Sequence, residues 1–254
     1  MKTDMCEALG VRLVEVGAAY GRRPVIDGIT TPRFTSGDLV AVLGLNGSGK
    51  STLLKRMAGL LTGPGRVELS GAGRDDIGYL PQDHASPAGL TVYESVLLSA
   101  KRDAGWSVSP AELSRVEATL AMLGLTPLAF RGLDTLSGGQ RQLASIAQSL
   151  VRQPRLLLMD EPTSALDLHR QLEILKILRD LAQRRGVIVF ISLHDVNLAL
   201  RFATHALVME NGRPLTCGLS ADVISAQMMA SAFKVEARVE TCSKGSTFVI
   251  LDEN

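Results

Sequence analysis

The stretch "GLNGSGKST" has the residue types and the spacing that bind phosphate groups. Its glycines let the backbone curl around phosphate oxygens, and the N–H groups at the start of the following helix point toward those oxygens. Lys50 is expected to reach the β- and γ-phosphates, and the Ser51 hydroxyl is expected to bind Mg²⁺. We therefore predict a phosphate-binding loop formed by Gly44, Asn46, Gly47, Ser48, Gly49, Lys50, Ser51 and Thr52.

Two acids, Asp160 and Glu161, follow the apolar run Leu156 to Met159. Carboxylates at the C-terminal end of a buried strand, beside a phosphate loop, are placed to serve a metal ion and a water molecule. We predict that Asp160 holds Mg²⁺ through water and that Glu161 orients or deprotonates the attacking water. The alternative, two ordinary acids that end a strand, is the weaker interpretation, and the complete phosphate loop weakens it further.

Three further side chains are candidates whose position alone leaves two interpretations open. His194 ends an apolar run, and it either has a structural role or reaches a γ-phosphate. Tyr20 either stacks on a base or is a half-buried strand residue. Gln82 follows a predicted strand, and by itself it carries no chemical signal. Asp195, next to His194, is predicted to cap the helix that follows it.

A second turn with the character of an anion site opens a helix further along the chain, at Ser137, Gly138, Gly139 and Gln140. The dipole at the N-terminus of that amphipathic helix favours negative charge. From spacing alone, Ser137 is expected to be an ordinary N-cap. These residues do not by themselves explain why one chain would carry two phosphate-binding turns.

The elements that must position these residues follow an α/β pattern, in which strand-like runs alternate with amphipathic helices. Such alternation predicts a largely parallel sheet. Strands are predicted at residues 38–45, 66–70, 76–80, 154–162 and 186–195. Between Gln82 and Pro154 the pattern predicts helices only, at 91–102, 110–123 and 138–152. After Gly212 we expect a strand, one helix over 220–233, and a final strand pair at 234–240 and 246–251.

The composition indicates a globular protein, with 46% apolar and 21% charged residues. Lys plus Arg (27) nearly balances Asp plus Glu (26), which gives no support for a nucleic-acid-binding surface. No apolar run approaches the roughly 20 residues that cross a bilayer, and the N-terminus lacks the apolar core of a signal peptide. The cysteines, Cys6, Cys217 and Cys242, form no metal or redox motif, so we predict a cytoplasmic protein.

The ordered set of motifs resembles the nucleotide-binding ATPase subunit of ATP-binding-cassette (ABC) transporters over nearly all of residues 10 to 240. "GLNGSGKST" resembles the Walker A loop, "YLPQ" the Q-loop, "LSGGQ" the family signature, "LLLMDE" the Walker B strand and "SALD" the D-loop. The resemblance implies that Tyr20 stacks on adenine, that Gln82 senses the metal and the γ-phosphate, and that His194 is the switch histidine. The expected catalytic residues are Glu161, His194 and Gln82, and the expected metal ligands are Ser51, Gln82 and Asp160.

The resemblance also implies the fold and the division of the chain. It implies an α/β P-loop NTPase fold, with a RecA-like core, an antiparallel β subdomain and an inserted α-helical subdomain. The ATPase domain would span 1–215, with its core at 1–85 and 154–215 and its helical subdomain at 86–153. Residues 216–254 would form a small C-terminal α/β appendage.

Two subunits of this family are implied to close head to tail, with two ATP molecules and their Mg²⁺ ions between them. Ser137, Gly138 and Gly139 would then grip the γ-phosphate bound by the other subunit, and Gln140 completes that signature turn. Asp167, which ends the D-loop, is expected among the nucleotide-binding residues. The second phosphate-binding turn would thus serve a neighbour's nucleotide.

The implied partners are a second copy of this chain and membrane permease subunits at the cytoplasmic face of the inner membrane. The permease would dock through the Q-loop and the helical subdomain, on the connectors around Gln82 and from Pro87 to Tyr93. A periplasmic or surface substrate-binding protein would take part indirectly, and no nucleic acid is expected.

The substrate class is indicated by the segments "LDLHRQLEIL", "LHDVNLALRFA" and "AFKVEARVE", which resemble the importer group for iron chelates, including siderophores, haem and cobalamin. The segment Gly59 to Tyr79 is shorter than in most of that group and resembles zinc and manganese importers. Import of zinc or manganese is therefore an alternative. A soluble ABC ATPase of iron–sulfur cluster assembly is another, and it would have no permease. A DNA-repair ATPase does not fit, because Lys50 and Ser137 are too close for a long inserted coiled coil.

Overall fold

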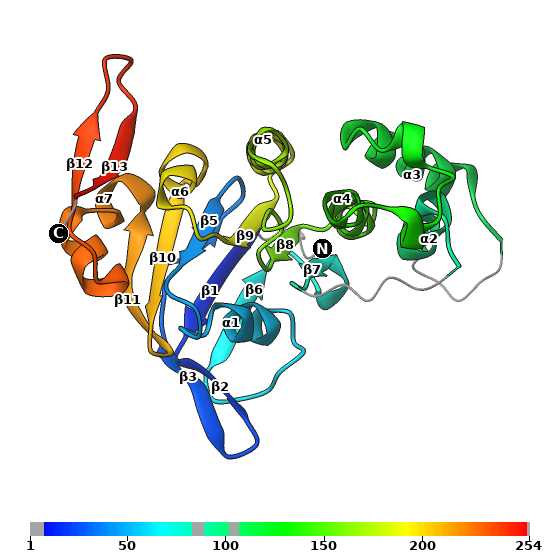
Figure 1. Ribbon diagram of the computed structural model, residues 1–254. Coiled ribbons are helices and arrows are strands. Elements are labelled where there is room, and N and C mark those ends of the chain that lie inside the picture. Colours follow the sequence, from blue (N-terminus) through cyan, green and yellow to red (C-terminus); the bar gives the residue numbers. More distant parts are fainter. Residues whose placement is uncertain (1–7, 83–88, 102–106, 253–254) are drawn as a thin grey trace.

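A computed structural model describes residues 8–82, 89–101 and 107–252 (Figure 1). Cys6 and Pro87, both named above, lie outside these ranges. Within them, no helix combines the length and the apolar character that a membrane span requires. The architecture is the predicted α/β fold, with one main sheet, a smaller antiparallel part and a group of helices at one side (Figure 1).

The central sheet has six strands in the order β11-β10-β5-β9-β8-β7. Neighbouring strands from β10 to β7 run parallel, and β11 pairs antiparallel with β10 at one edge. In sheet order the strands are Arg213–Leu219, His205–Glu210, Leu39–Leu43, Ile188–Ser192, Leu156–Met159 and Ile77–Leu80. The predicted strands at 38–45, 76–80, 154–162 and 186–195 each contain one of them, although the hydrogen-bonded parts are shorter.

Both faces of this sheet are covered, which explains why its parallel strands are mainly apolar. In β5, Leu39, Ala41 and Leu43 pack in one hydrophobic cluster, whereas Val40 and Val42 pack in the other, because successive side chains point to opposite faces. The first cluster includes residues of α5, Leu168–Arg185, and α6, Val196–Phe202. The second includes residues of α1, Lys50–Met57, and of the antiparallel strands.

The antiparallel part lies on the α1 side of the sheet. One small sheet has the order β4-β1-β6, and β2 and β3 form a separate two-stranded sheet. The bounds are β1 Gly10–Val14, β2 Val16–Tyr20, β3 Arg23–Ile29, β4 Phe34–Thr35 and β6 Arg66–Ser70, with the short helix η1 Arg74–Asp76 before β7. β6 has the bounds predicted from the sequence.

The predicted helices between Gln82 and Pro154 are present and lie to one side of the sheet, next to β7 and β8 (Figure 1). They are α2 Val92–Ala100, α3 Pro110–Met122 and α4 Gly138–Leu150, with the short helices η2 Thr126–Leu128 and η3 Leu133–Thr135. Each long helix begins with a capping box, in which a hydroxyl and a Glu or Gln side chain exchange hydrogen bonds with backbone N–H groups. The pairs are Thr91 with Glu94, Ser109 with Glu112, and Ser137 with Gln140.

The C-terminal region differs from the sequence prediction. The single helix expected over 220–233 is wrong, because the segment is divided into α7 Ser220–Val223, α8 Ala226–Met228 and one π-turn, η4 Met229–Phe233. Ile224 and Ser225 have extended backbones, and the Ser225 hydroxyl accepts a hydrogen bond from Met228 N, so the chain restarts there.

The last two strands form a hairpin, β12 Ala237–Thr241 and β13 Thr247–Leu251. This hairpin is fixed to α6, since Asn197 exchanges two hydrogen bonds with the backbone of Val249, of 3.1 and 2.7 Å. The predicted boundary between residues 215 and 216 falls inside β11, so the core sheet continues past that point to Leu219.

Candidate active site

The phosphate loop connects β5 to α1, and its path depends on glycine. Gly44 has a φ of 139°, and a Cβ placed there would lie 2.2 Å from the Met209 carbonyl oxygen. Gly49, the N-cap of α1, has a φ of 102°, and its Cβ would lie 2.6 Å from a methyl group of Ile26. Because a side chain fits at neither position, the backbone itself forms the wall of this loop.

Lys50 lies inside the loop, with only 5% of its surface exposed. Its ammonium donates hydrogen bonds to the carbonyl oxygens of Gly44, at 2.8 Å, and Leu45, at 3.1 Å. Burial lowers the pKa of Lys50, and the negative charges of Glu161 and Asp160 oppose that shift. The loop therefore holds the Lys50 ammonium where a phosphate would be bound. The carboxylates of Asp160 and Glu161 lie close enough to favour its charged form.

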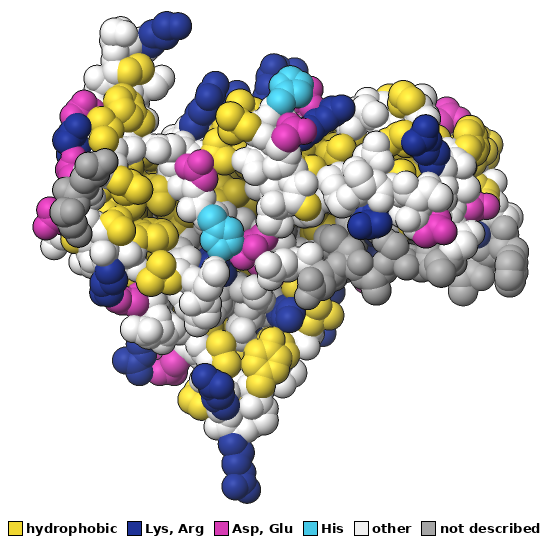
Figure 2. All heavy atoms as spheres, viewed as in Figure 1, with side chains coloured by type: hydrophobic (Ala, Val, Ile, Leu, Met, Phe, Trp, Pro, Cys, Tyr) yellow, Lys and Arg dark blue, Asp and Glu magenta, His cyan; other side chains and the backbone are white. Residues whose placement is uncertain are grey.

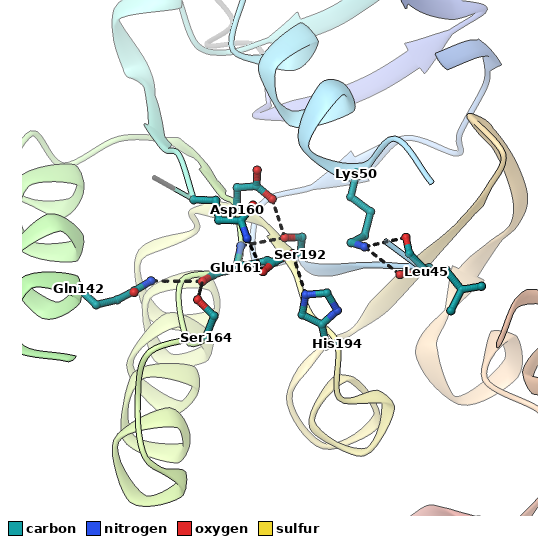
Figure 3. A network of polar contacts seen from close by, with 10 residues as sticks. Leu45, Lys50, Gln142, Asp160, Glu161, Ser164, Ser192 and His194 are labelled. Carbon is teal, nitrogen blue, oxygen red and sulfur yellow. Dashed lines mark hydrogen bonds and ion pairs between the residues drawn. The ribbon is translucent and has the colours of Figure 1, made fainter. Parts of the chain in front are cut away.

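Asp160 and Glu161 follow β8 directly, as predicted, and they lie in different environments. Asp160 is 2% exposed, and its Oδ1 accepts a hydrogen bond of 2.9 Å from the Ser192 hydroxyl. Glu161 has a φ of 49°, which is uncommon for a residue with a side chain. Its backbone N–H donates to the same Ser192 oxygen at 2.8 Å (Figure 3).

The Glu161 carboxylate lies between the other two predicted catalytic side chains. Its Oε1 is 2.7 Å from His194 Nε2, and its Oε2 accepts a hydrogen bond of 2.8 Å from the Gln82 amide. These three residues follow the C-terminal ends of β8, β9 and β7, so the parallel sheet brings them to one edge. Figure 3 shows Glu161, His194 and Lys50 in one group of side chains, with the Lys50 ammonium directed toward the Leu45 carbonyl.

A cavity of about 280 Å³ lies between the loop and these side chains. Its lining combines loop residues with all three predicted catalytic residues. The lining residues are Val25, Asn46, Gly47, Gly49, Lys50, Ser51, Thr52, Gln82, Glu161 and His194. A larger cavity, of about 680 Å³, lies between α3 and the start of β8, and none of the predicted site residues lines it. The larger of these two cavities is therefore not the one that the predicted catalytic residues line.

The donor groups around this cavity suit a magnesium–phosphate ligand. Carboxylate, hydroxyl and amide oxygens are ligands that Mg²⁺ prefers. The Ser51 hydroxyl and the Gln82 amide line the cavity, whereas the predicted ligand Asp160, directly before Glu161 in the chain, is buried and is not part of the lining. No cluster of three or more His, Cys, Asp or Glu side chains that could cage a metal occurs among the residues the structure describes. Mg²⁺ usually keeps several of its waters and binds phosphate oxygens together with one or two protein ligands. The buried lysine and the glycine-walled loop fit the phosphates.

Other predicted site residues do not meet this cavity. Ser137 is exposed at the start of α4, where it accepts from Gln140 N at 3.3 Å and its own N–H donates to Gln140 Oε1 at 3.1 Å. Neither these residues nor Gly138 and Gly139 line the cavity. Asp167 caps α5 by accepting from Arg170 N at 2.9 Å. Tyr20, 48% exposed on β2, also lies outside the lining.

Two residues that the sequence analysis did not single out complete the network. Ser192 bridges Asp160 and the Glu161 backbone, and Gln142 of α4 donates to the Glu161 carbonyl at 3.2 Å. Ser192 is the last residue of β9 and the polar exception in an apolar strand, a signal that could have identified it. Gln142 offered no such signal, because glutamine is common on amphipathic helices.

Known proteins share this sequence pattern. The pattern of the ABC transporter family matches residues 30–164. The iron(3+)-hydroxamate import ATP-binding protein FhuC of Bacillus subtilis is 33% identical over 241 residues, which cover 89% of this chain and 88% of that protein. The hemin import ATP-binding protein HmuV of Rhodopseudomonas palustris is 36% identical over 231 residues, which cover 85% of each.

Solved structures share the fold. An inward-facing ABC transporter assigned to the metal-chelate type matches with a TM-score of 0.84 and 29% identity, over 96% of this chain and 97% of that one. A dimeric ATP-binding cassette in a post-hydrolysis state, bound to ADP and Pi, matches with a TM-score of 0.73 and 28% identity, over 83% and 98%.

The fold and the clustered site define a P-loop nucleotide hydrolase. More particularly, the chain belongs to the ABC transporter family, as one of its ATP-binding subunits. The predictions of the P-loop NTPase fold, of the family, of ATP as ligand and of ATPase activity are confirmed. The roles of single residues stay predictions.

Proposed function

We propose that this chain hydrolyses ATP at a site shared with a second copy of itself, and thereby drives uptake of an iron chelate through a membrane permease. The observation that carries this proposal is the position of the Glu161 carboxylate, which is hydrogen-bonded to Gln82 and paired with His194 beside the buried Lys50. A base, a cation and two polar sensors in one small cavity suit attack of water on a terminal phosphate.

Each of these residues has a distinct task in that reaction. Lys50 neutralises the β- and γ-phosphates, and Glu161 accepts a proton from the water whose oxygen attacks the γ-phosphorus while the bond to ADP breaks. His194, 2.7 Å from Glu161, holds that carboxylate in place. Mg²⁺, when bound with ATP, would be held by Ser51, Asp160 and Gln82 and would neutralise phosphate charge.

A second copy of the chain supplies what the single chain lacks. Ser137, Gly138 and Gly139 present backbone N–H groups and a hydroxyl at the N-terminus of α4, yet they do not reach their own cavity. Head-to-tail pairing would place them on the γ-phosphate in the partner's loop, with Asp167 near the same interface. ATP would then hold the two copies together, and hydrolysis would release them. The ADP- and Pi-bound dimer of the related cassette supports this arrangement.

The helical subdomain offers a surface for the permease. Phe130 is 82% exposed and stacks on Tyr93, with ring centroids 5.7 Å apart. Leu98, on α2, is also exposed, and Figure 2 shows hydrophobic side chains on the helical side of the molecule. Exposed aromatic and aliphatic side chains of this kind suit docking of an apolar element. The chain would thus be a peripheral protein at the cytoplasmic face of the inner membrane, indirectly linked to a substrate-binding protein.

Relatives support an iron chelate as the transported compound, since proteins with 33% and 36% identity are named for import of iron(3+)-hydroxamate and of hemin. The structure of the metal-chelate type agrees in fold over nearly the whole chain. Because specificity would reside in the permease and the binding protein, zinc or manganese import is tested by the same experiment.

That experiment is affinity purification of Glu161→Gln from native membranes in mild detergent, with the co-purifying proteins identified by mass spectrometry. We expect a polytopic permease to co-purify, and its binding protein can then be tested for iron chelates, haem, cobalamin, zinc and manganese. Recovery of soluble scaffold proteins alone would contradict transport and favour an ATPase of iron–sulfur cluster assembly.

A further inference from the structure

Ser192 occupies an unusual place at the end of β9. The other residues of that strand, Ile188 to Ile191, are buried and apolar, and Ser192 itself is only 1% exposed. A hydroxyl in such a position is costly unless it is hydrogen-bonded. Its partners belong to neither β9 nor the helix after it, since they are the two acids at the end of the adjacent strand β8.

The hydroxyl uses both of its hydrogen-bonding capacities on these acids. It donates its proton to Asp160 Oδ1 at 2.9 Å, and its oxygen accepts the Glu161 N–H at 2.8 Å (Figure 3). A serine hydroxyl has one proton, so donating it to Asp160 leaves lone pairs for the Glu161 N–H. One buried oxygen atom thus connects the side chain of one acid to the backbone of the next.

This connection occurs where the backbone adopts an unfavourable conformation. Glu161 has a φ of 49°, in the left-handed region, where residues with a Cβ persist only if their surroundings hold them. Ser192 holds the N–H of that residue, and Gln142 holds its carbonyl at 3.2 Å. The turn directs the carboxylate toward His194 and Gln82.

We infer that Ser192 is a positioning residue for ATP hydrolysis, which fixes the metal-binding carboxylate of Asp160 and the catalytic carboxylate of Glu161 in one geometry. This inference rests on the proposed function of those two acids. Ser192 does not line the cavity beside the phosphate loop, and it acts through its two hydrogen-bonded partners. Outer hydrogen bonds of this kind typically change metal affinity or activity by about 10- to 100-fold.

Three substitutions separate hydrogen bonding from packing. Ser192→Ala removes the hydroxyl, and Ser192→Cys fills a similar volume with a weak donor and acceptor. Ser192→Thr keeps the hydroxyl on a residue that suits a strand. We expect kcat for ATP hydrolysis to fall by about 10- to 100-fold in the Ala and Cys variants, and less in the Thr variant. Equal activity of wild type and Ser192→Cys would overturn the inference in favour of packing.

The matched control is Ser220→Ala. Ser220 is also buried, at 3% exposure, but its hydroxyl has no hydrogen-bond partner in the described part of the chain. Its loss should leave kcat unchanged. Thermal melting of each variant shows whether it is folded, and a Ser192→Thr variant that melts like wild type but is as slow as Ser192→Ala would also contradict the inference.

A binding measurement tests the inference without turnover. The Kd of a fluorescent ATP analogue is measured with Mg²⁺ and with EDTA, and the ratio of the two reports how far metal strengthens nucleotide binding. We expect Ser192→Ala to reduce that ratio by about tenfold, while its Kd in EDTA stays within about twofold of wild type. An unchanged ratio would overturn the inference.

The two failures can be told apart. A wild-type protein that hydrolyses no ATP contradicts the proposed function, and the ratio of the two Kd values then still tests the link between Ser192 and the metal site. A wild-type protein that hydrolyses ATP, together with a Ser192→Ala variant equal to it in both kcat and that ratio, contradicts the inference alone.

Discussion

The phosphate loop and the signature turn both place a helix N-terminus where an anion can bind, yet they differ in burial and in partners. Lys50 is 5% exposed inside the loop, and it lies beside two carboxylates. Ser137 is exposed, and its N–H and its hydroxyl bond within the capping box that it forms with Gln140. The phosphate loop shares its cavity with the predicted catalytic side chains, whereas the signature turn offers anion-binding groups outside that cavity.

The two regions are nevertheless connected. The signature turn opens α4, and Gln142 on the second turn of that helix donates to the Glu161 carbonyl. A change at the exposed turn can therefore reach the carboxylate of Glu161, the predicted base of the same chain, through a helix only 13 residues long. The exposed signature turn is free to contact a second subunit, and the hydrogen bond from Gln142 links that turn to Glu161 of its own chain.

The largest effect is expected for Glu161→Gln, which keeps the shape of the side chain but replaces the carboxylate base with an amide. Hydrolysis should fall by about a thousandfold, since general bases contribute on the order of 100- to 10,000-fold. ATP binding should be retained, because Lys50 and the loop are unchanged. Phosphate release and analytical ultracentrifugation with ATP would check this, and we expect an ATP-bound dimer. A variant that stays monomeric and still hydrolyses ATP would contradict the role of Glu161.

Ser137→Arg tests the exposed turn. We expect hydrolysis to fall by about a hundredfold, as when a donor to a developing charge is removed, whereas nucleotide binding by the isolated subunit should not change. Ser109→Arg is the matched control, because Ser109 begins α3 with the same kind of capping box. It should lose similar helix stability, about 1 kcal/mol, without loss of hydrolysis. Weaker nucleotide binding by the Ser137→Arg monomer would mean that the turn acts within its own chain.

Tyr20→Ala tests how far the site extends beyond the cavity described above. Tyr20 is exposed on β2 and lies outside that cavity, so its predicted contact is with the base rather than the phosphates. Base–aromatic stacking contributes about 1–3 kcal/mol, so the Kd for ATP should rise about tenfold. Calorimetry would measure it, with Tyr93→Ala as the control aromatic. An unchanged Kd would make Tyr20 a structural residue.

Gln140→Ala is expected to have the smallest effect. It removes the returning half of the capping box at α4, whose loss should lower the free energy of unfolding by about 0.5–1 kcal/mol. Hydrolysis should fall less than in Ser137→Arg, because Gln140 Oε1 is occupied by the N–H of Ser137 in its own chain. Thermal melting and phosphate release would check both. A loss of hydrolysis as large as that of Ser137→Arg would place Gln140 on the nucleotide.

Much of this site could be predicted because its signals are local. The loop Gly44 to Thr52 contains its complete pattern in nine residues, and Asp160 and Glu161 follow an apolar strand whose end had to meet that loop. Strands β5, β9, β8 and β7 were predictable for the same reason, since each is a short and mainly apolar run, whereas the central strand β10 was missed.

The remainder depends on contacts between distant residues. Ser192 becomes informative only once β9 lies beside β8, because its two partners are 32 and 31 positions away. Segment 220–233 is divided into short helices because Ser225 caps a new helix within it. The apolar residues of the segment recur with a helical period, so the sequence predicted one continuous helix. The predicted boundary between residues 215 and 216 cuts through β11, because the pairing of β11 with β10 leaves no trace in the local sequence.

The most direct test of the shared site mixes two inactive subunits, Lys50→Ala and Ser137→Arg. In a head-to-tail dimer of one copy of each, both defects fall in one site and the other site is intact. Half of the dimers in an equal mixture should be mixed, so hydrolysis should recover to about a quarter of the wild-type rate. If the mixture stays as inactive as either variant alone, although the subunits exchange, each chain uses its own signature turn and the central claim is contradicted.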